Sequence, residues 1–424
     1  MNQLGWRQVA LKSIWNRRLT SALTIISIAL SIILLLTVNQ VRRGGEEGFT
    51  QAISQVDLIV GARSGPLNLL LYTVFNMGSP SNNISWKTYE HFNSHPSVEW
   101  TIPYSLGDGH RGFRVVGTDA RFFQHYRFRG GQQLQFASGK YKEELWSVVL
   151  GATVAKKLSY ALDHKVVLAH GATTGDGVIK HDDKPFQVTG ILESTGTVLD
   201  HALYISLESM EALHLDWQSG AVPTAATAIP ADQIKKEDLK VEQLTSFFLR
   251  TKSRIETLRL QREINTYQEE ALSAIIPGVV LSELWRGLDY VDKSLKAISW
   301  IVVLVGFVGM MIALLAGLNE RRREMAVFRA LGAGPRVIFG LLFFESTLLT
   351  LMGVLLGLVI QGLVFVLVSQ LLSIHFGIYL SAAWISWSEM LIIIFTSLIG
   401  SLMGLIPALR AYRYTLKDGL SVSI

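Results

Sequence analysis

The chain has 424 residues, of which 49% are hydrophobic and 17% are charged, and it contains no cysteine. This composition is too apolar for a single soluble domain. The absence of cysteine excludes disulfides, thiolate zinc sites and cysteine nucleophiles. Residues 39–296 hold 27 basic and 29 acidic residues, whereas the rest of the chain holds 12 and 5. The positive excess that gives the net charge of +5 therefore lies in the segments beside the apolar runs. No nucleic-acid partner is predicted.

Four apolar runs have the length of membrane-spanning helices. Residues 19–38 and 297–318 are uncharged, and about 20 such residues cross the roughly 30 Å of a bilayer's hydrocarbon. Residues 337–372 predict an interfacial segment followed by the third span, and residues 390–409 predict the fourth. Small residues permit close helix contact. Glycines in the last two runs either have such a packing role or reflect only the high frequency of glycine in membrane helices. They are Gly353, Gly357, Gly362, Gly400 and Gly404.

The basic residues beside these runs predict an orientation, because Lys and Arg are retained on the cytoplasmic side. Residues 1–18, 319–336 and 410–424 are rich in Lys and Arg, whereas residues 373–389 have none. Both termini are therefore expected in the cytoplasm, although Arg42 and Arg43 argue weakly against it. Residues 1–18 are interpreted as an amphipathic interfacial helix. A cleaved signal peptide is the alternative, but no small-residue cleavage pattern follows the first run.

The large segment at 39–296 is predicted to be an outer α+β domain inserted between the first two spans. Short apolar runs bounded by Gly, Asp and Pro are typical of strands, and short helices are expected between them. The strands are predicted at residues 56–60, 113–117, 147–150, 165–169, 186–192 and 202–206, the helices at 151–158 and 207–213, and turns at 171–177 and 219–231.

A helical stalk is predicted over about residues 243–296. Residues 244–271 have helical spacing, and a second segment after Pro277-Gly278 carries a heptad seam that continues into the second span. Such a seam is either ordinary packing against a neighbouring helix or one side of a rigid rod. The first span is similarly expected to continue outward to Gln51, although Gly44-Gly45 weakens that helix. The seam consists of Leu284, Leu288, Val291, Leu295, Ile298 and Val302.

The cytoplasmic loop from Glu320 to Ala333 is predicted to be a short amphipathic helix. It carries apolar side chains among its arginines, and Gly332 suits a helix C-terminus. Such a helix can lie in a groove of a soluble partner. A merely solvated, positively charged loop is the alternative, but it leaves the apolar residues Met325, Val327 and Phe328 unexplained.

This loop resembles the E-R-x-x-E-x-x-x-x-R-A-L-G-A signature of the FtsX, MacB and LolC/LolE family of ABC transporter permeases. Residues 10–20, 113–119, 149–152 and 186–192 are similar to other segments of that family, as is the order of one span, a large insert and three spans. The tail departs from the pattern, because Tyr414-Thr415-Leu416 stands where the family often has proline.

The resemblance implies a mechanotransmission permease of the type VII class, without a fused ATPase. It implies a dimer with a second copy or a paralogue, docked on a cytoplasmic ABC ATPase subunit that binds ATP and Mg, and a motion relayed through the stalk to the periplasmic domain. The coupling residues implied by the signature are Glu320, Glu324, Met325, Phe328, Arg329, Ala330, Leu331 and Gly332.

The sequence contains no catalytic motif of its own. There is no G-x-x-x-x-G-K-[ST], H-E-x-x-H or G-x-S-x-G. Nine of ten histidines lie in residues 39–296, including His181 beside Asp182. They are interpreted as surface residues, so no metal or cofactor site is predicted. Glu345 is expected near the inner interface facing a partner, with an ion relay as the alternative.

We therefore expect a multi-pass protein of the cell inner membrane that contacts lipid and acts as the non-catalytic permease subunit of an ATP-driven transporter. Its expected cargo is a lipoprotein, a lipid, a peptide or a small toxic compound, passed on with a possible periplasmic adaptor or lipoprotein. An FtsX-like signalling or scaffold protein that activates a periplasmic cell-wall hydrolase is the alternative. A membrane enzyme is a weaker third interpretation.

Overall fold

The computed structural model describes two compact units, which are treated separately below. The helix unit comprises residues 1–44, 288–368 and 381–424, and the sheet unit comprises residues 45–287 and 369–380. The residues that the structure describes are 12, 14, 15, 17–170, 179–217, 229–320, 334–376 and 385–410.

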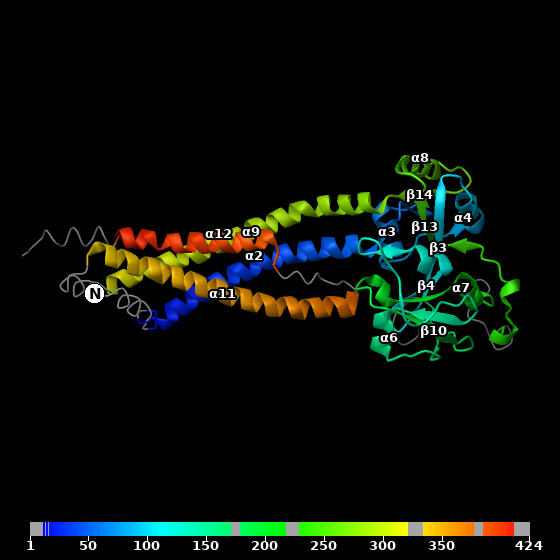
Figure 1. Cartoon of the computed structure of the whole chain (residues 1–424), viewed down its shortest axis with the longest axis horizontal. Helices are drawn as coiled ribbons and strands as arrows, with labels where there is room; N and C mark the ends of the chain where they lie inside the picture. The colour runs from blue at the N-terminus through cyan, green and yellow to red at the C-terminus, as the bar shows by residue number, and fades with distance from the viewer. Residues whose placement is uncertain are drawn as a thin grey trace, which may run out of the picture. The chain divides into compact units, whose positions relative to one another are not determined.

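Four long helices account for all four predicted spans (Figure 1). Each contains a segment long enough and apolar enough to cross a membrane. Two of these helices begin or end well beyond the predicted spans, because no residue between breaks them. The expected continuation of the first helix past Gly44-Gly45 is thus confirmed. The helices are α2 (Arg18–Ala52), α9 (Pro277–Glu320), α11 (Pro335–Phe376) and α12 (Trp387–Met403).

Close packing of α2 against α11 depends on glycines. A Cβ on Gly353 would lie 2.7 Å from Cβ of Ile28, and one on Gly357 would lie 3.0 Å from Cβ of Ile32. The first distance is shorter than real Cβ contacts and the second is tighter than most of them, so the two helices approach where α11 has no side chain. The predicted packing role of these glycines is confirmed, and Gly400 and Gly404 make similar contacts with Thr350 and Ser346 of α11.

The sheet unit is built on a ten-stranded mixed sheet. Its strand order is β14-β1-β13-β3-β4-β11-β8-β10-β7, with β9 paired to β10. Two-stranded sheets join β12 to β2 and β5 to β6. The strands are β1 (Leu58–Ala62), β2 (Ile84–Ser85), β3 (Val98–His110), β4 (Phe113–Thr118), β5 (Arg127–Phe128), β6 (Gln132–Gln133), β7 (Phe136–Gly139), β8 (Ser147–Leu150), β9 (Lys165–Val166), β10 (Phe186–Leu192), β11 (Ala202–Ser206), β12 (Gln243–Leu244), β13 (Ser246–Thr251) and β14 (Leu272–Ile275).

Short helices cover the sheet, and several match the predicted ones. The predicted helices at 151–158 and 207–213 correspond to α6 and α7, and the predicted strands at 147–150, 186–192 and 202–206 are β8, β10 and β11. The predicted turn at 171–177 and most of that at 219–231 lie outside the described residues. The helices are α3 (Pro66–Val74), α4 (Trp86–Asn93), α5 (Ala120–His125), α6 (Ala152–Leu158), α7 (Leu207–His214) and α8 (Arg254–Asn265), with 3-10 turns at Val198–His201, Ala231–Gln233 and Lys236–Asp238.

The structure corrects the first half of the predicted stalk. Residues 246–251 form strand β13, which pairs with β1 on one side and β3 on the other, and only α8 within 244–271 is helical. The physical reason is burial on both faces of the sheet. Phe248 packs in one hydrophobic core and Phe247 in another, so neither face of this segment is solvent-exposed. Helical spacing in a short apolar run does not exclude a fully buried strand.

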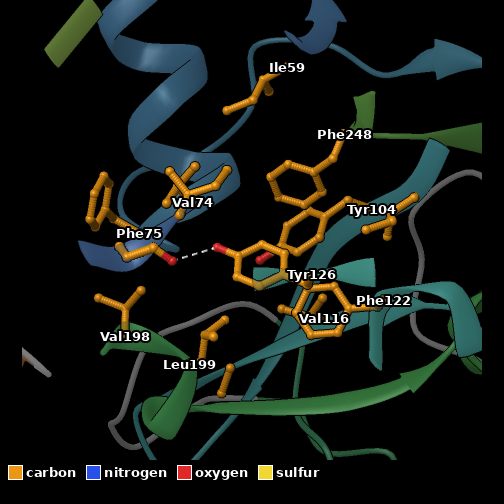
Figure 2. Close-up of a cluster of buried hydrophobic side chains, with 14 of the residues drawn as sticks. Ile59, Val74, Phe75, Tyr104, Val116, Phe122, Tyr126, Val198, Leu199 and Phe248 are labelled. Carbon is orange, nitrogen blue, oxygen red and sulfur yellow. Dashed lines mark hydrogen bonds between the residues drawn. The ribbon is translucent and has the colours of Figure 1, made fainter. Parts of the chain in front are cut away.

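The last turn of α2 and the first turns of α9 contribute residues to the hydrophobic core of the sheet unit. Ala52, in the last turn of α2, and Val280 and Leu281, near the start of α9, are buried in the same cluster as Tyr126 and Phe248. Figure 2 shows part of this cluster, in which the ring of Tyr126 lies beside those of Phe122 and Phe248. The Tyr126 hydroxyl donates a hydrogen bond to the carbonyl of Ala52 at 3.0 Å. Burial raises the pKa of Tyr126, so the hydroxyl keeps its proton and remains a donor.

We expect Gly353→Leu to destabilise the helix unit. A larger side chain must displace Ile28, and overpacking of this kind costs about 1–3 kcal/mol. Thermal unfolding of the detergent-solubilised protein, followed by circular dichroism, measures the effect. Gly309→Leu is the matched control, because a Cβ at that helical glycine meets nothing within 4 Å. Equal losses in the two variants would contradict the packing role.

Candidate functional site: a polar network in the helix unit

A buried pair of amides connects α2 to α11. Gln361 and Gln40 are 3% and 5% exposed, and Nε2 of Gln361 donates to Oε1 of Gln40 at 2.7 Å. The hydroxyl of Thr37 donates to Oε1 of Gln361 at 2.9 Å. A buried amide without partners costs several kcal/mol in an apolar medium. Gln361 uses both ends of its amide, so α11 is fixed to one turn of α2.

A buried carboxylate connects the same turn of α2 to the start of α12. Glu389 is fully buried and accepts from Nδ2 of Asn39 at 3.2 Å and from Nη1 of Arg43 at 3.5 Å. It also accepts from the backbone N–H of Ser386 at 2.7 Å, whose hydroxyl accepts from the N–H of Glu389. This reciprocal capping box fixes the first turn of α12. Glu389 therefore positions two helices at once.

An ion pair connects α2 to α9. Nη1 of Arg42 lies 2.7 Å from Oδ2 of Asp292, and Nη2 lies 3.6 Å from Oδ1 of Asp289. Asp292 also binds Lys296 at 2.9 Å along its own helix. We name the polar network as the set Thr37, Asn39, Gln40, Arg42, Arg43, Asp292, Gln361 and Glu389. Within it, five residues of α2 contact one residue on each of the three other long helices.

Glu345 lies in a small polar recess of the helix unit, apart from the polar network. Its side chain is 3% exposed, and it lines a small recess together with Arg17, Thr24 of α2 and Leu314 of α9. The expectation that Glu345 faces a partner protein was wrong. Its position three to four residues from Leu342 and Leu349 places it on the buried face of α11, where the hydroxyl-bearing residues of α2 supply polar surroundings.

The predicted stalk seam lies on an exposed face of α9. Leu288, Val291, Leu295 and Ile298 are 43%, 54%, 44% and 53% exposed, and Leu284 is half-buried. The buried face of α9 instead runs through Asp292, Ser299, Val303, Phe307 and Met310. The seam is therefore not packing against another helix in the part of this chain that the structure describes.

The predicted coupling residues fall at the edge of the described structure. Glu320 is the last residue of α9. The others, Glu324, Met325, Phe328, Arg329, Ala330, Leu331 and Gly332, lie outside the described residues, as do residues 1–11 and 411–424.

The polar network was not predicted as a site. Most of its members stand alone or in pairs at or beyond the ends of the apolar runs, and Glu389 was assigned to the loop before the fourth span. The available signal was a glutamine, Gln361, in the middle of an otherwise apolar run. A polar residue in that position requires a partner, but the sequence does not say which one.

Comparison with known families decides the identity of the chain. Residues 21–266 match the MacB-like periplasmic core domain, and residues 296–416 match the FtsX-like permease C-terminal domain. The chain belongs to this family of ABC transporter permeases. The predicted resemblance of the chain to this family is thereby confirmed.

Two curated relatives are likewise named as permeases. An uncharacterized ABC transporter permease of Methanocaldococcus jannaschii is 24% identical over 94% of this chain and 93% of its own length. The pyoverdine export ATP-binding/permease protein PvdT of Pseudomonas syringae pv. tomato is 24% identical over 83% of this chain, which spans 50% of that protein. The crystal structure of the periplasmic region of MacB from Actinobacillus actinomycetemcomitans matches 55% of this chain and 94% of its own, with 9% identity and a TM-score of 0.34.

The permease's Arg43 and Glu389 are expected to be energetically coupled. Glu389→Ala removes the buried carboxylate that the Arg43 guanidinium contacts, whereas the double variant removes both members of the pair. In a double-mutant cycle with Arg43→Ala, we expect a coupling energy of about 1–3 kcal/mol in thermal unfolding. Simple additivity of the two single variants would show that the contact contributes nothing.

Proposed function

We propose that this permease is a mechanical relay that transmits the motion of a cytoplasmic ATPase to a periplasmic domain. In this proposal it spans the inner membrane four times, with both termini in the cytoplasm and the sheet unit outside. The bias of Lys and Arg toward the termini and residues 319–336 supports this orientation. Arg42 and Arg43, the two exceptions, have acidic partners in Asp292 and Glu389.

The continuity of α9 is the observation that carries this proposal. The helix runs from Pro277 to Glu320 without interruption. Its first turns contribute Val280 and Leu281 to the core of the sheet unit, and its last residue opens the family's signature. A displacement at the cytoplasmic end is thus passed along one helix, because a packed helix moves as a body more readily than it compresses.

The polar network supports the relay by holding the helices together. Buried hydrogen bonds and ion pairs in a bundle are costly to break. One turn of α2 has partners on α9, α11 and α12. We infer that the four helices tilt or translate together rather than slide past one another, which transmits the stroke of the ATPase.

The energy for this stroke comes from a partner ATPase in our proposal. The chain has no phosphate-binding loop, so ATP and Mg bind elsewhere. The coupling helix at 320–333 is the proposed contact, with Met325, Phe328 and Leu331 as its apolar side chains. The relative PvdT is named as an ATP-binding/permease protein, which agrees with an ATPase acting on this kind of permease.

The docking proposal predicts the effect of two substitutions in this helix. Phe328→Asp combined with Leu331→Asp should reduce co-purification of the ATPase at least tenfold, because two buried apolar contacts become charges. Arg322→Asp with Arg323→Asp is a control that changes more charge but leaves the apolar face intact. Membrane insertion of each variant is checked by fractionation. Undiminished co-purification of the first variant would remove the docking proposal.

The exposed seam of α9 supports a dimer with a second copy of the permease. Its residues repeat at spacings of 4 and 3, the pattern of a coiled-coil interface, and they remain exposed within one chain. Apolar side chains at such spacing bury surface when an equivalent helix packs alongside. A paralogue with the same seam would fit equally, and the family supports either partner.

Cysteine cross-linking tests the seam directly, because the native chain has no cysteine. In membranes containing only this permease, Val291→Cys and Leu295→Cys are each expected to form a disulfide-linked dimer under mild oxidation. Lys293→Cys is the matched control: it is exposed on the same helix, nearly opposite the seam. Equal cross-linking at all three positions, or none at the two seam positions, would contradict a homodimer along this face.

The proposed cargo is a lipoprotein, a lipid, a peptide or a small toxic compound that is extracted or exported. Transport is favoured over activation of a cell-wall hydrolase, because the relatives named for a process are exporters. Periplasmic pull-down distinguishes the two: recovery of a hydrolase without extracted cargo would favour signalling.

A further inference from the structure

Three histidines and one aspartate meet in the sheet unit. Asp108, His170, His181 and His214 each offer one ligand atom, and these atoms all lie within 4.8 Å of one another. They are spread over more than a hundred residues of the sequence, so they do not form a recognisable sequence motif. Asp108 and His181 are buried, His214 is partly buried and His170 is half-exposed.

Asp108 lies at an irregularity of strand β3. The register of β3 against β4 shifts between Leu106 and Gly109, which marks a bulge. Bulges redirect side chains and are common beside functional sites. A Cβ on the preceding residue, Gly107, would lie 2.7 Å from the sulfur of Met210, so the chain approaches α7 closely here. The bulge therefore turns a carboxylate toward the end of α7.

His170 and His181 are held by two paired segments beside that bulge. Ala169 forms an antiparallel bridge with Gly109 and another with Lys180. The N–H of His170 donates to the carbonyl of Ile179 at 2.8 Å, and that of His181 donates to the carbonyl of Leu168 at 2.9 Å. Backbone hydrogen bonds thus fix both histidines next to Asp108.

His214, the last residue of α7, completes the group. Its Nδ1 contacts the carbonyl of Met210 at 3.2 Å, and a carbonyl only accepts, so Nδ1 carries the proton and Nε2 of the neutral ring presents a lone pair. A histidine whose second nitrogen donates to a backbone carbonyl is the usual arrangement for a metal ligand. Beyond it, a buried ion pair between Lys184 and Asp216, 2.6 Å apart, ties the segments that bear His181 and His214.

Three separations among the ligand atoms are close to the edges of a tetrahedron around a small cation. Nδ1 of His170 lies 3.2 Å from Nε2 of His214, and Oδ2 of Asp108 lies 3.1 Å from Nε2 of His181 and 3.5 Å from Nε2 of His214. The other aspartate oxygen, Oδ1, lies 3.4 Å from Nδ1 of His170. Zinc bonds to nitrogen and oxygen of about 2.0–2.1 Å imply tetrahedral edges of about 3.3–3.4 Å.

Two of these atoms also lack other partners. Oδ2 of Asp108 and Nε2 of His181 are enclosed and make no hydrogen bond among the described residues. Buried polar groups are almost always satisfied, so such a pair requires an explanation. Trp217 lies over the group, with its ring 4.8 Å from that of His170 and 5.1 Å from that of His181, and so shields one side from solvent.

We propose that Asp108, His170, His181 and His214 bind one Zn²⁺ ion. Three imidazoles and one carboxylate are a donor set that zinc accepts in four-coordinate sites. Cu²⁺ prefers tetragonal and Mg²⁺ octahedral oxygen-rich surroundings, which the 3.1–3.5 Å separations do not provide. All four positions come from protein, so the ion has a structural role: it fastens the His170 and His181 segments and the end of α7 to strand β3.

Metal titration of the full-length permease tests this proposal. Protein purified in detergent without a polyhistidine tag is stripped with EDTA, dialysed and titrated with ZnCl₂ in a calorimeter, and with CoCl₂ in a spectrophotometer. We expect one Zn²⁺ per chain, visible absorption bands of tetrahedral Co²⁺, and a higher unfolding temperature with zinc, because an ion that binds only the folded state stabilises it.

Two variants remove ligands while preserving the fold. Asp108→Asn keeps the size of the side chain, and His170→Ala changes a half-exposed residue. Each should weaken zinc binding at least tenfold and abolish the zinc-dependent rise in unfolding temperature. His91→Ala is the control, since His91 is an exposed histidine of the same unit outside the group. Absence of stoichiometric zinc, absence of tetrahedral Co²⁺ bands, or equal zinc binding by all variants would overturn the proposal.

Discussion

The helix unit depends on about two turns of α2 whose polar side chains have partners on the other long helices. Within residues 37–43, Thr37 and Gln40 bind Gln361, Arg43 binds Glu389 and Arg42 binds Asp292. A buried polar group without a partner destabilises the fold by more free energy than a hydrogen-bonded one contributes. The partners therefore determine which helices are neighbours and in what register they pack. Apolar contacts of leucine and isoleucine do not carry that information, because they are tolerant of sliding and rotation.

The same α2 helix ends in the core of the sheet unit, where Tyr126 donates to the carbonyl of Ala52. The first turns of α9 contribute to that core as well. Helices α2 and α9 thus each have polar partners in the helix unit and apolar contacts in the core of the sheet unit. Hydrogen bonds and ion pairs define the position of each helix in the helix unit, and burial of apolar side chains stabilises its end in the core of the sheet unit.

Much of the fold was predictable because its signals are local. Apolar runs of about 20 residues identified all four long helices, and short apolar runs bounded by Gly, Asp or Pro located β8, β10 and β11. Strand β13 was missed because Phe247 and Phe248 are buried on opposite faces, which removes the alternation that marks a strand. The polar network and the histidine group were missed for a different reason. Their members are hundreds or tens of residues apart, and only the folded topology brings Glu389 to Asn39 or His214 to Asp108.

The position of β1 between β14 and β13 has an evolutionary consequence. Ile59, shortly after α2, pairs with Ile275, shortly before α9, so the chain enters and leaves the sheet unit at neighbouring points. Domains whose ends lie close together are easily exchanged as inserts. A sheet unit of this kind can accordingly be exchanged by recombination at two adjacent junctions, with little change to the long helices.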